Sequence, residues 1–512
     1  MADLERVRKR YTSSAPEAHV DVLIVGAGLS GIGAAWHLQR HCPDRSYAIL
    51  EGRPAIGGTW DLFRYPGIRS DSDMYTLGYS FEPWTDSKAI ADGPTILNYV
   101  NRVADKYDIR RHIGFQHHVT RADFDSERAL WTVEATRKDT DETVTFTCNW
   151  LHMCSGYYNY REAYLPDFPG TDRFKGRFFH AQFWPEDLEI GGKTVVVIGS
   201  GATAVTIVPE MAKAGAQVIM LQRSPTYMIS RPAIDKLANR LRKLLGDKAS
   251  YGLIRWRNVL VQQFYFQLAR KRPEYMKQFL RKELLKELPP GYEVDRHFKP
   301  TYNPWDQRLC LVPDADLFGC IREGTVEVVT DTIETFTEDG VRLASGRELV
   351  ADVVVAATGL KLQLLSDVQF TVDGATKKLG DTMTYKGMMF GDVPNLSYSF
   401  GYTNASWTLK ADLTAGYLCR LLNHMKATNT QVAVPRREAD VREVPFLDFT
   451  SGYVQRALEI LPKQGDRAPW KLHQNYARDM ASLKLGKIED GVMEFRRTAV
   501  AAPARSLTKE NA

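Results

Sequence analysis

Residues 21–31 read DVLIVGAGLSG, a continuous apolar run that ends in glycines at positions 26, 28 and 31. The run predicts a buried parallel strand, and the glycines occupy the GxGxxG positions of a dinucleotide-binding turn. A helix-like segment follows at 32–41, and the next strand-like segment ends at Glu51, 20 residues after Gly31. An acid at this point accepts hydrogen bonds from a ribose, while the helix N-terminus receives a pyrophosphate. The segment therefore predicts a complete dinucleotide-binding unit.

The pattern repeats in residues 193–204, KTVVVIGSGATA, with Gly199, Gly201 and Ala204 at the three turn positions. The strand after it ends in Gln222-Arg223-Ser224 and carries no acid. A cation at that place suits the 2′-phosphate of NADP, whereas Glu51 in the first unit suits FAD. The sequence thus predicts FAD and NADPH as cofactors. The alternative for Arg223 is that it is an ordinary surface charge.

Two such units predict an α/β fold of two Rossmann-like domains, with the NADP domain inserted in the FAD domain. We expect residues 1–160 to form the first part of the FAD domain and 161–350 the NADP domain. Residues 351–512 would hold the second part of the FAD domain and a C-terminal extension. The strand at 351–359 would return the chain to the first domain, and the loop at 151–159 would be its counterpart on the way out.

A helical insert is expected at 231–300, on the NADP unit. Its amphipathic pieces are LANRLRKLL and EYMKQFLRKELLKEL. The insert carries 17 Lys and Arg against 7 Asp and Glu, although the net charge of the whole chain is only +5. A solvated or domain-packing face and a weak peripheral membrane contact are both compatible with this excess. No motif points to nucleic acid.

Composition excludes several classes of protein. With 44% hydrophobic and 25% charged residues, the 512-residue chain is typical of globular proteins. No apolar run approaches the roughly 18 residues of a membrane span, and residues 1–20 lack a secretory signal, so we expect a cytoplasmic protein. The six cysteines lack metal-site spacing, and His37 and His41 are expected on a solvated helix face, so no metal site is predicted.

The electron acceptor follows from what lies beside the flavin. A dithiol acceptor would need a close cysteine pair after the first unit, where the chain instead reads Gly57-Gly58-Thr59-Trp60. Molecular oxygen is the remaining major acceptor.

Two motifs carry a family resemblance. Residues 57–71, GGTWDLFRYPGIRSD, and 174–185, FKGRFFHAQFWP, resemble the two fingerprints of type I Baeyer–Villiger monooxygenases, which are class B flavoprotein monooxygenases. Within that family the chain is most similar to the ethionamide-activating subgroup, through YNPWDQRLC at 302–310 and GYTNASWTLK at 401–410. It departs from the wider family at Gln307, where many members have lysine.

The resemblance implies an NADPH-dependent reaction in which reduced FAD and O2 form a C4a-peroxide. That species inserts one oxygen atom into a ketone, giving an ester or lactone, and can also oxygenate the sulfur of thioethers or thioamides. Arg308 matches the active-site arginine, whose fixed charge would stabilise the anionic oxygen species, and Asp71 would orient it. The alternatives are an ordinary salt bridge for Arg308 and helix capping by Asp71 or Ser72.

The same resemblance implies roles for the other site residues. His180 and Trp184 would order the linker between the domains, with a purely structural His180 as the alternative. The residues expected at FAD are Gly26, Gly28, Ser30, Gly31, Glu51, Thr59, Trp60, Asp61, Leu62, Asp71 and Val119. Those expected at NADP are Arg69, Ser70, Asp71, Gly199, Ser200, Gly201, Ala202, Thr203, Ala204, Val205, Arg223 and Ser224.

Two rival functions remain. An S/N-oxygenating flavin monooxygenase would use the same cofactors with little ketone activity, and a non-catalytic flavoprotein could act as a redox sensor. The substrate, the oligomeric state and the role of residues 430–512 do not follow from the sequence.

Overall fold

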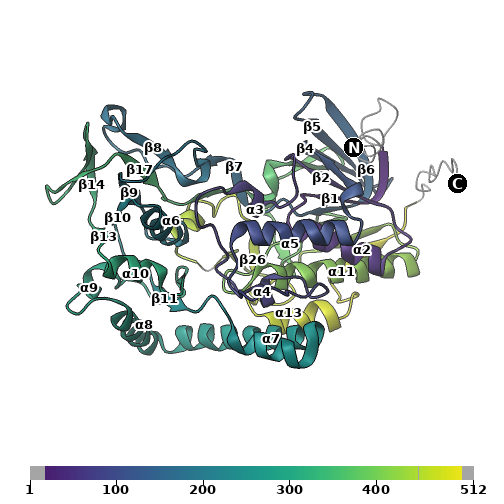
Figure 1. Cartoon of the computed structure of the whole chain (residues 1–512). Coiled ribbons are helices and arrows are strands. Elements are labelled where there is room, and N and C mark those ends of the chain that lie inside the picture. The colour runs from purple at the N-terminus through teal and green to yellow at the C-terminus, as the bar shows by residue number, and fades with distance from the viewer. Residues whose placement is uncertain (1–17, 448, 499–512) are drawn as a thin grey trace.

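The computed structural model describes residues 18–447 and 449–498, so most of the segment examined for a secretory signal lies outside the described residues. Two lobes stand side by side, each built on its own sheet, and the long helix α7 (Lys236–Lys271) runs along the base of both (Figure 1). No helix in the described part of the chain is long and apolar enough to cross a membrane.

The first lobe contains an 11-stranded mixed sheet. Its parallel centre has the order β3-β2-β1-β6, in which Val25 of β1 pairs with Leu50 on one side and Met153 on the other. Val22, Leu23 and Ile24 are fully buried, as the continuous apolar run predicts. The strands of this sheet are β1 (Ala18–Val25), β2 (Tyr47–Glu51), β3 (Ile113–Phe115), β4 (His117–Asp125), β5 (Leu130–Arg137), β6 (Thr143–Met153), β19 (Gln369–Val372), β20 (Ala375–Lys377), β21 (Thr384–Tyr385), β22 (Met389–Phe390) and β23 (Leu396–Tyr398).

Helices pack against this parallel centre. The helix of the first glycine turn, α2, contacts α11 and α5, and the short helices α3 and α4 follow it in the chain. The helices of this lobe are α2 (Leu29–His41), α3 (Thr59–Leu62), α4 (Met74–Leu77), α5 (Gly93–Lys106) and α11 (Trp407–Ala427).

The second lobe contains a five-stranded parallel sheet with the order β13-β10-β9-β17-β8. Helix α6 (Ala202–Lys213) starts at the second glycine turn and packs on β9 and β10. An antiparallel meander of β14 (Ile333–Phe336), β15 (Gly340–Leu343) and β16 (Glu348–Val350) adjoins it. The strands of the parallel sheet are β8 (Arg177–His180), β9 (Thr194–Ile198), β10 (Gln217–Gln222), β13 (Val326–Thr330) and β17 (Val353–Ala356).

The strand predicted to return the chain to the first domain is placed differently. β17 pairs with β9 and β8 in the second sheet, because its four residues are all buried and need a parallel neighbour on each edge. The chain crosses only afterwards, through β18 (Leu360–Leu362), which pairs antiparallel with the outgoing β7 (Tyr158–Ala163). The two connections between the lobes therefore lie side by side, and the second domain is inserted in the first.

The insert is helical, as predicted, but it spans both lobes rather than belonging to the second alone. Helix α7 is interrupted at Gly246 (φ 74°) and packs against α4 of the first lobe. Helix α8 (Pro273–Glu287) packs against β11 (Met228–Arg231), which pairs with β12 (Cys310–Pro313) on the second.

The chain after α11 stays with the first lobe. Its elements are β24 (Val432–Pro435), β25 (Glu443–Pro445), α12 (Gly452–Gln455), β26 (Lys463–Gly465), α13 (Tyr476–Met480) and β27 (Met493–Arg496).

Candidate functional site

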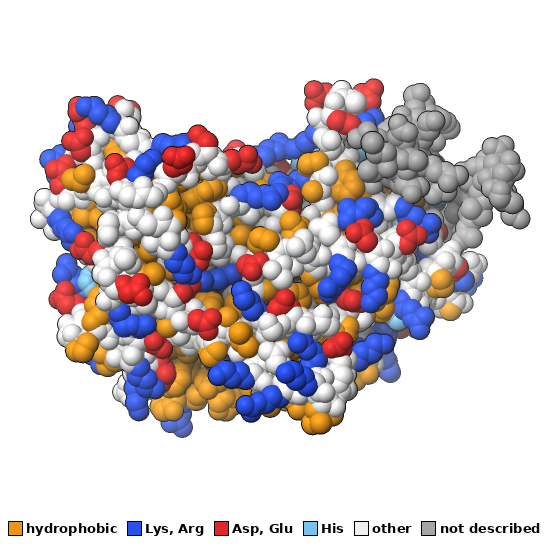
Figure 2. Space-filling view, viewed as in Figure 1, with side chains coloured by type: hydrophobic (Ala, Val, Ile, Leu, Met, Phe, Trp, Pro, Cys, Tyr) orange, Lys and Arg blue, Asp and Glu red, His pale blue; other side chains and the backbone are white. Residues whose placement is uncertain are grey.

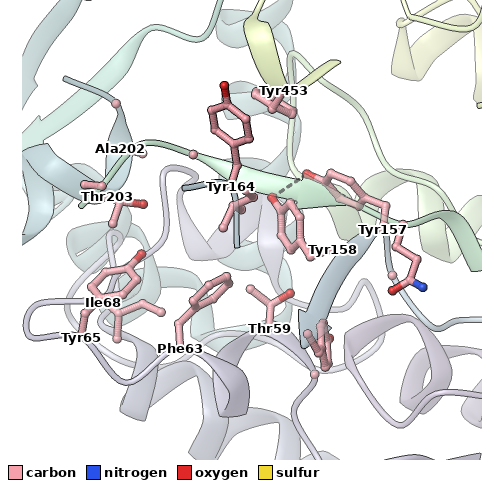
Figure 3. A pocket seen from close by; sticks show the side chains of 18 of the residues that line it. Thr59, Phe63, Tyr65, Ile68, Tyr157, Tyr158, Tyr164, Ala202, Thr203 and Tyr453 are labelled. Atoms are coloured by element: carbon pink, nitrogen blue, oxygen red, sulfur yellow. Dashed lines mark hydrogen bonds between the residues drawn. The ribbon is translucent and has the colours of Figure 1, made fainter. Parts of the chain in front are cut away.

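A cavity of about 1670 Å³ is lined by residues of both lobes. Both glycine turns, the segment at 57–72, Gln307 to Cys310 and the two connections between the lobes all contribute to its wall. Figure 3 shows part of this wall, in which Tyr157, Tyr158, Tyr164 and Tyr453 lie opposite Phe63 and Tyr65.

The first glycine turn presents unpartnered backbone donors to the cavity. Gly26 has φ +106°, and α2 begins after Gly28 without a side-chain cap, so its first N–H groups are available to an anion. Glu51 is buried and accepts hydrogen bonds from the backbone nitrogens of Ala27 (2.7 Å) and Arg53 (2.9 Å). Burial raises the pKa of Glu51, although both bonds oppose the change. The buried hydroxyl of Ser155, also in the wall, has no partner, and this donor set fits FAD.

The second glycine turn has the same construction. Gly199 has φ +139°, and a Cβ there would lie 2.4 Å from the carbonyl oxygen of Ala357. Helix α6 begins after Gly201, again without a side-chain cap. The exposed Arg223 borders the cavity just beyond β10, where it can meet a 2′-phosphate. These residues fit NADP.

The two predicted catalytic residues meet across the cavity. Arg308 Nη1 lies 3.3 Å from Asp71 Oδ2, and their side chains are 40% and 35% exposed to the cavity space. Desolvation opposes the charge of Arg308, but Tyr157, Tyr453 and Tyr158, which are anionic only at high pH, together with Asp71 raise its pKa above the ordinary value. The guanidinium is therefore a permanent cation held in a largely aromatic wall.

The aromatic wall is itself ordered. The ring of Tyr157 stacks on Trp407 with centroids 5.1 Å apart, and its hydroxyl lies 2.7 Å from that of Tyr158 (Figure 3). Burial raises the pKa of Tyr158 to about 12 and that of Tyr157 well above its ordinary value, so both hydroxyls are neutral at ordinary pH. The wall offers apolar surface together with a few hydrogen-bonding groups, as small-molecule sites usually do.

Most of the predicted site residues line this cavity. They are Gly26, Gly28, Ser30, Glu51, Thr59, Trp60, Arg69, Ser70, Asp71, Val119, Gly199, Ser200, Gly201, Ala202, Thr203, Arg223, Ser224 and Arg308. The guanidinium of Arg69, however, is also bound to Asp316 at 2.5 Å.

The remaining predicted cofactor residues are not among the residues that line it: Gly31, Asp61, Leu62, Ala204 and Val205. Gly31 instead permits close packing, since a Cβ there would lie 1.9 Å from the carbonyl oxygen of Gly26. The buried carboxylate of Asp61 is bound by Arg53 at 2.6 Å and by Arg64 at 2.7 Å.

Helix capping, the alternative role for Asp71 or Ser72, belongs to a different residue. Asp73 is the N-cap of α4 and accepts from the backbone nitrogen of Thr76 at 3.1 Å. The side chain of Asp71 is left to face Arg308.

His180 and Trp184 lie outside the cavity wall, at the connections between the lobes. His180 Nδ1 accepts from the backbone nitrogen of Gln182, and Nε2 lies 3.1 Å from the carbonyl oxygen of Gly359. Burial lowers the pKa of His180, so the ring is neutral and Nε2–H donates to Gly359. Gln182 in turn donates to the carbonyl oxygen of Asn159, so this segment contacts both connections. Trp184 packs edge-on against Phe179.

Sequence reasoning missed several residues of the wall. Ser451, Gly452, Tyr453 and Arg456 come from the C-terminal region, where no motif marked them. The sequence predicted residues 151–159 only as a connection and did not single out Tyr157 and Tyr158. Two adjacent aromatic residues after a buried strand were an available signal for a pocket wall. Among the described residues, no group of three or more His, Cys, Asp or Glu side chains could hold a metal ion.

Comparisons with known proteins agree on one family. Residues 86–365 match the family described as flavin-binding monooxygenase-like, and residues 24–88 match an NAD(P)-binding Rossmann-like domain. The chain is 54% identical to the FAD-containing monooxygenase EthA of Mycobacterium tuberculosis (strain CDC 1551 / Oshkosh), over 93% of this chain and 98% of that protein. It is 50% identical to EthA of Mycolicibacterium smegmatis, over 95% and 99%.

The solved structures give the same fold. An oxidised steroid monooxygenase bound to NADP aligns over 94% of this chain and 100% of its own, with a TM-score of 0.74 and 22% identity.

Proposed function

The chain belongs to the flavin-binding monooxygenase-like family, and we propose that it catalyses Baeyer–Villiger oxidation. A ketone, O2, NADPH and a proton would give an ester or lactone, NADP⁺ and water. One oxygen atom enters the carbon–carbon bond beside the carbonyl, and the other leaves as water. The enzyme is an FAD- and NADPH-dependent oxidoreductase.

The two cofactors have separate places in the cavity. The turn at Gly26 and Gly28, with Glu51, would hold the FAD pyrophosphate and ribose, and the turn at Gly199 and Gly201, with Arg223, would hold NADPH. Bound FAD would supply the redox chemistry, which is acceptance of a hydride from NADPH and activation of O2. The protein supplies binding, orientation and electrostatics.

The Arg308–Asp71 pair is the observation that carries the proposal. Oxygen insertion passes through negatively charged oxygen, which a fixed guanidinium stabilises because it stays charged and can donate two hydrogen bonds. Asp71 holds Arg308 in place.

The wall also limits the substrate class. Tyr157, Tyr158 and Tyr453 surround the space beside Arg308 with rings, which favours long or aromatic ketones over small polar ones. Thioethers of similar shape are the second proposed substrates, and O2 is the co-substrate.

A product analysis tests this function. The FAD-loaded protein is mixed with NADPH, air and either an aryl-alkyl ketone or a thioether, and the products are identified by mass. We expect an ester from the ketone, and its loss in Arg308→Ala. Sulfoxide without any ester would support the S/N-oxygenating rival, and a flavin that NADPH cannot reduce would support the redox sensor.

We also propose a cytoplasmic location and a weak peripheral membrane contact through residues 231–300. The outer face of α7 exposes Leu253, Trp256, Leu260 and Phe264 at helical spacing. No acidic residue occurs from Lys248 to Lys271, and Figure 2 shows basic and hydrophobic side chains together along the lower edge, where α7 lies. An apolar stripe with basic neighbours suits the surface of an anionic bilayer.

A further inference from the structure

The inner face of α7 binds the segment that follows Asp71. Asn258 donates to Asp73 Oδ1 at 2.8 Å, and Gln262 donates to Asp73 Oδ2 at 3.1 Å. The same carboxylate caps α4, so the two α7 amides fix both its oxygens. Asp73 is only two residues beyond Asp71, and its position therefore determines where Asp71 can lie.

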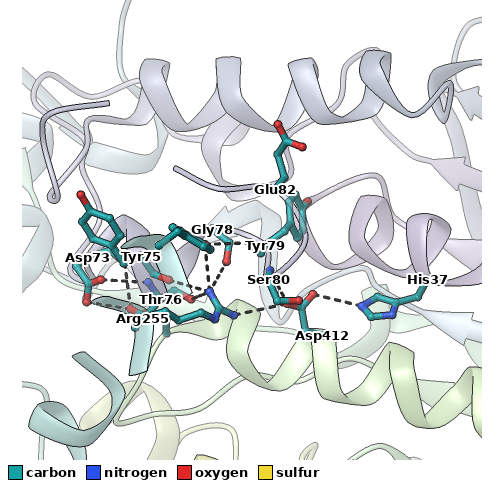
Figure 4. Close-up of polar contacts among 12 residues, drawn as sticks. His37, Asp73, Tyr75, Thr76, Gly78, Tyr79, Ser80, Glu82, Arg255 and Asp412 are labelled. Carbon is teal, nitrogen blue, oxygen red and sulfur yellow. Dashed lines mark hydrogen bonds and ion pairs between the residues drawn. The ribbon is translucent and has the colours of Figure 1, made fainter. Parts of the chain in front are cut away.

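Arg255 holds the other end of this segment (Figure 4). Its buried Nη1 donates to the carbonyl oxygens of Tyr75 (2.8 Å) and Gly78 (2.7 Å), at the end of α4. Its Nη2 lies 3.6 Å from Asp412 of α11. Asp412 also lies 3.5 Å from His37. The sequence predicted His37 on a solvated helix face, but its side chain is buried against this carboxylate. The segment after Asp71 is thus held between α7 and α11.

The far end of α7 binds the loop that carries Arg308. Arg270 Nη1 lies 2.7 Å from Asp306 Oδ1, and Asp306 is two residues before Arg308. Asp306 is fixed further by Asn303, whose backbone nitrogen donates to it, and by Thr450, which donates to its carbonyl oxygen. One helix therefore contacts both loops of the catalytic pair.

We propose that α7 sets the separation of Arg308 and Asp71, with Asn258, Gln262 and Arg270 as positioning residues. Gln262 and Arg270 are eight residues apart, a span of about 12 Å at about 1.5 Å per residue. An unbroken helix holds such a distance because stretching it would break backbone hydrogen bonds. The two loops belong to different lobes. Without α7 their relation would depend on the paired connections, the Arg69–Asp316 ion pair and the bonds of Thr450 to Asp306. This inference rests on the proposed function of the Arg308–Asp71 pair.

The test compares two arginines of the insert. Arg270→Met removes the bond to Asp306, and Arg281→Met removes the similar Arg281–Asp295 pair (2.9 Å) on α8, away from the cavity. We expect Arg270→Met to lower the product formed per NADPH consumed about tenfold, since a misplacement of about 1 Å can cost about 100-fold in rate. Arg270→Lys should recover most of the yield, and Arg281→Met should match the unchanged protein.

Two further measurements separate positioning from folding. Hydrogen–deuterium exchange should rise in residues 303–309 of Arg270→Met while the Tm stays the same, because a half-exposed ion pair contributes little to global stability. Arg270→Met should also change the rate of NADPH consumption in the otherwise unchanged protein, and it should not change that rate in an Arg308→Ala background.

The inference is overturned if Arg270→Met keeps its yield and its exchange pattern, if Arg281→Met loses as much, or if the loss simply follows a lower Tm. If the proposed function of Arg308 were itself wrong, Arg308→Ala would leave product formation unchanged, which distinguishes that failure from a failure of the inference about α7.

Discussion

Arg223 is the residue on which the choice between NADPH and NADH depends. It is exposed and borders the cavity. It follows the second strand of its own unit, at the position where the first unit has Glu51. We predict that Arg223→Gln raises the KM for NADPH about 10- to 100-fold, since a hydrogen bond to a charged group contributes about 1.5–3 kcal/mol. The KM for NADH should hardly change. Arg342→Gln, on the meander, is the control, and equal losses with both nucleotides would argue against a 2′-phosphate contact.

At this scale the sequence predicted what local chemistry requires. The glycines at 26, 28, 199 and 201, Glu51 and Arg223 lie where short-range rules place them, because each acts within one strand–turn–helix unit. The ion pairs of the buried Asp61 with Arg53 and Arg64, by contrast, were not indicated by anything in the local pattern.

Among the elements, α2 depends on the absence of a side chain at Gly31. We predict that Gly31→Ala lowers the free energy of unfolding by about 1–3 kcal/mol and weakens flavin retention, because the added Cβ pushes α2 away from β1. Gly416→Ala in α11 is the matched control, since its Cβ meets nothing within 4 Å and should stabilise the protein by about 0.5–1 kcal/mol. Denaturant unfolding and the flavin content of the purified protein check both. A tolerated Gly31→Ala would show that the turn has more room than the structure gives it.

Helix and strand types followed from periodicity, but their partners did not. The strand at 351–359 was expected to return the chain to the first domain, but its residues 353–356 pair in the second sheet. A fully apolar strand fits any buried parallel position. The contacts of α7 with both lobes depend on residues that are far apart in sequence, such as Asp73 and Asn258. The tyrosine wall likewise joins Tyr157 to Tyr453 across nearly 300 positions.

The stability of the whole molecule should depend on pH through its buried histidines. Burial lowers the pKa of His152 to about 4, although Ser397 bonds to its ring. The unfolded chain therefore takes up this proton first as the pH falls. Stability is then complete above the ordinary value of 6.5 and is lost toward pH 4, by up to about 3 kcal/mol at about 1.4 kcal/mol per unit. Denaturant titrations across this range should give a shallower pH dependence for His152→Gln, and an unchanged dependence would exclude this cause.

The outer face of the molecule gives a prediction about membranes. We expect the protein to sediment with vesicles that contain phosphatidylglycerol but not with pure phosphatidylcholine, and less so in high salt. Leu260→Ser should weaken this binding, whereas Leu485→Ser, at an even more exposed leucine outside the insert, should not. Absence of vesicle binding would contradict the proposal, and self-association lost in Leu260→Ser would show that a second copy covers the stripe instead.

Mass analysis of the product made under isotopically labelled O2 tests the central claim most directly. An aryl-alkyl ketone is incubated with NADPH, and the ester is examined for the label. We predict an ester that carries one labelled oxygen atom from the unchanged enzyme and none from Arg308→Ala. An Arg308→Ala enzyme that still forms labelled ester at the full rate, or an unchanged enzyme that reduces its flavin with NADPH but never forms ester from any ketone, would contradict the account.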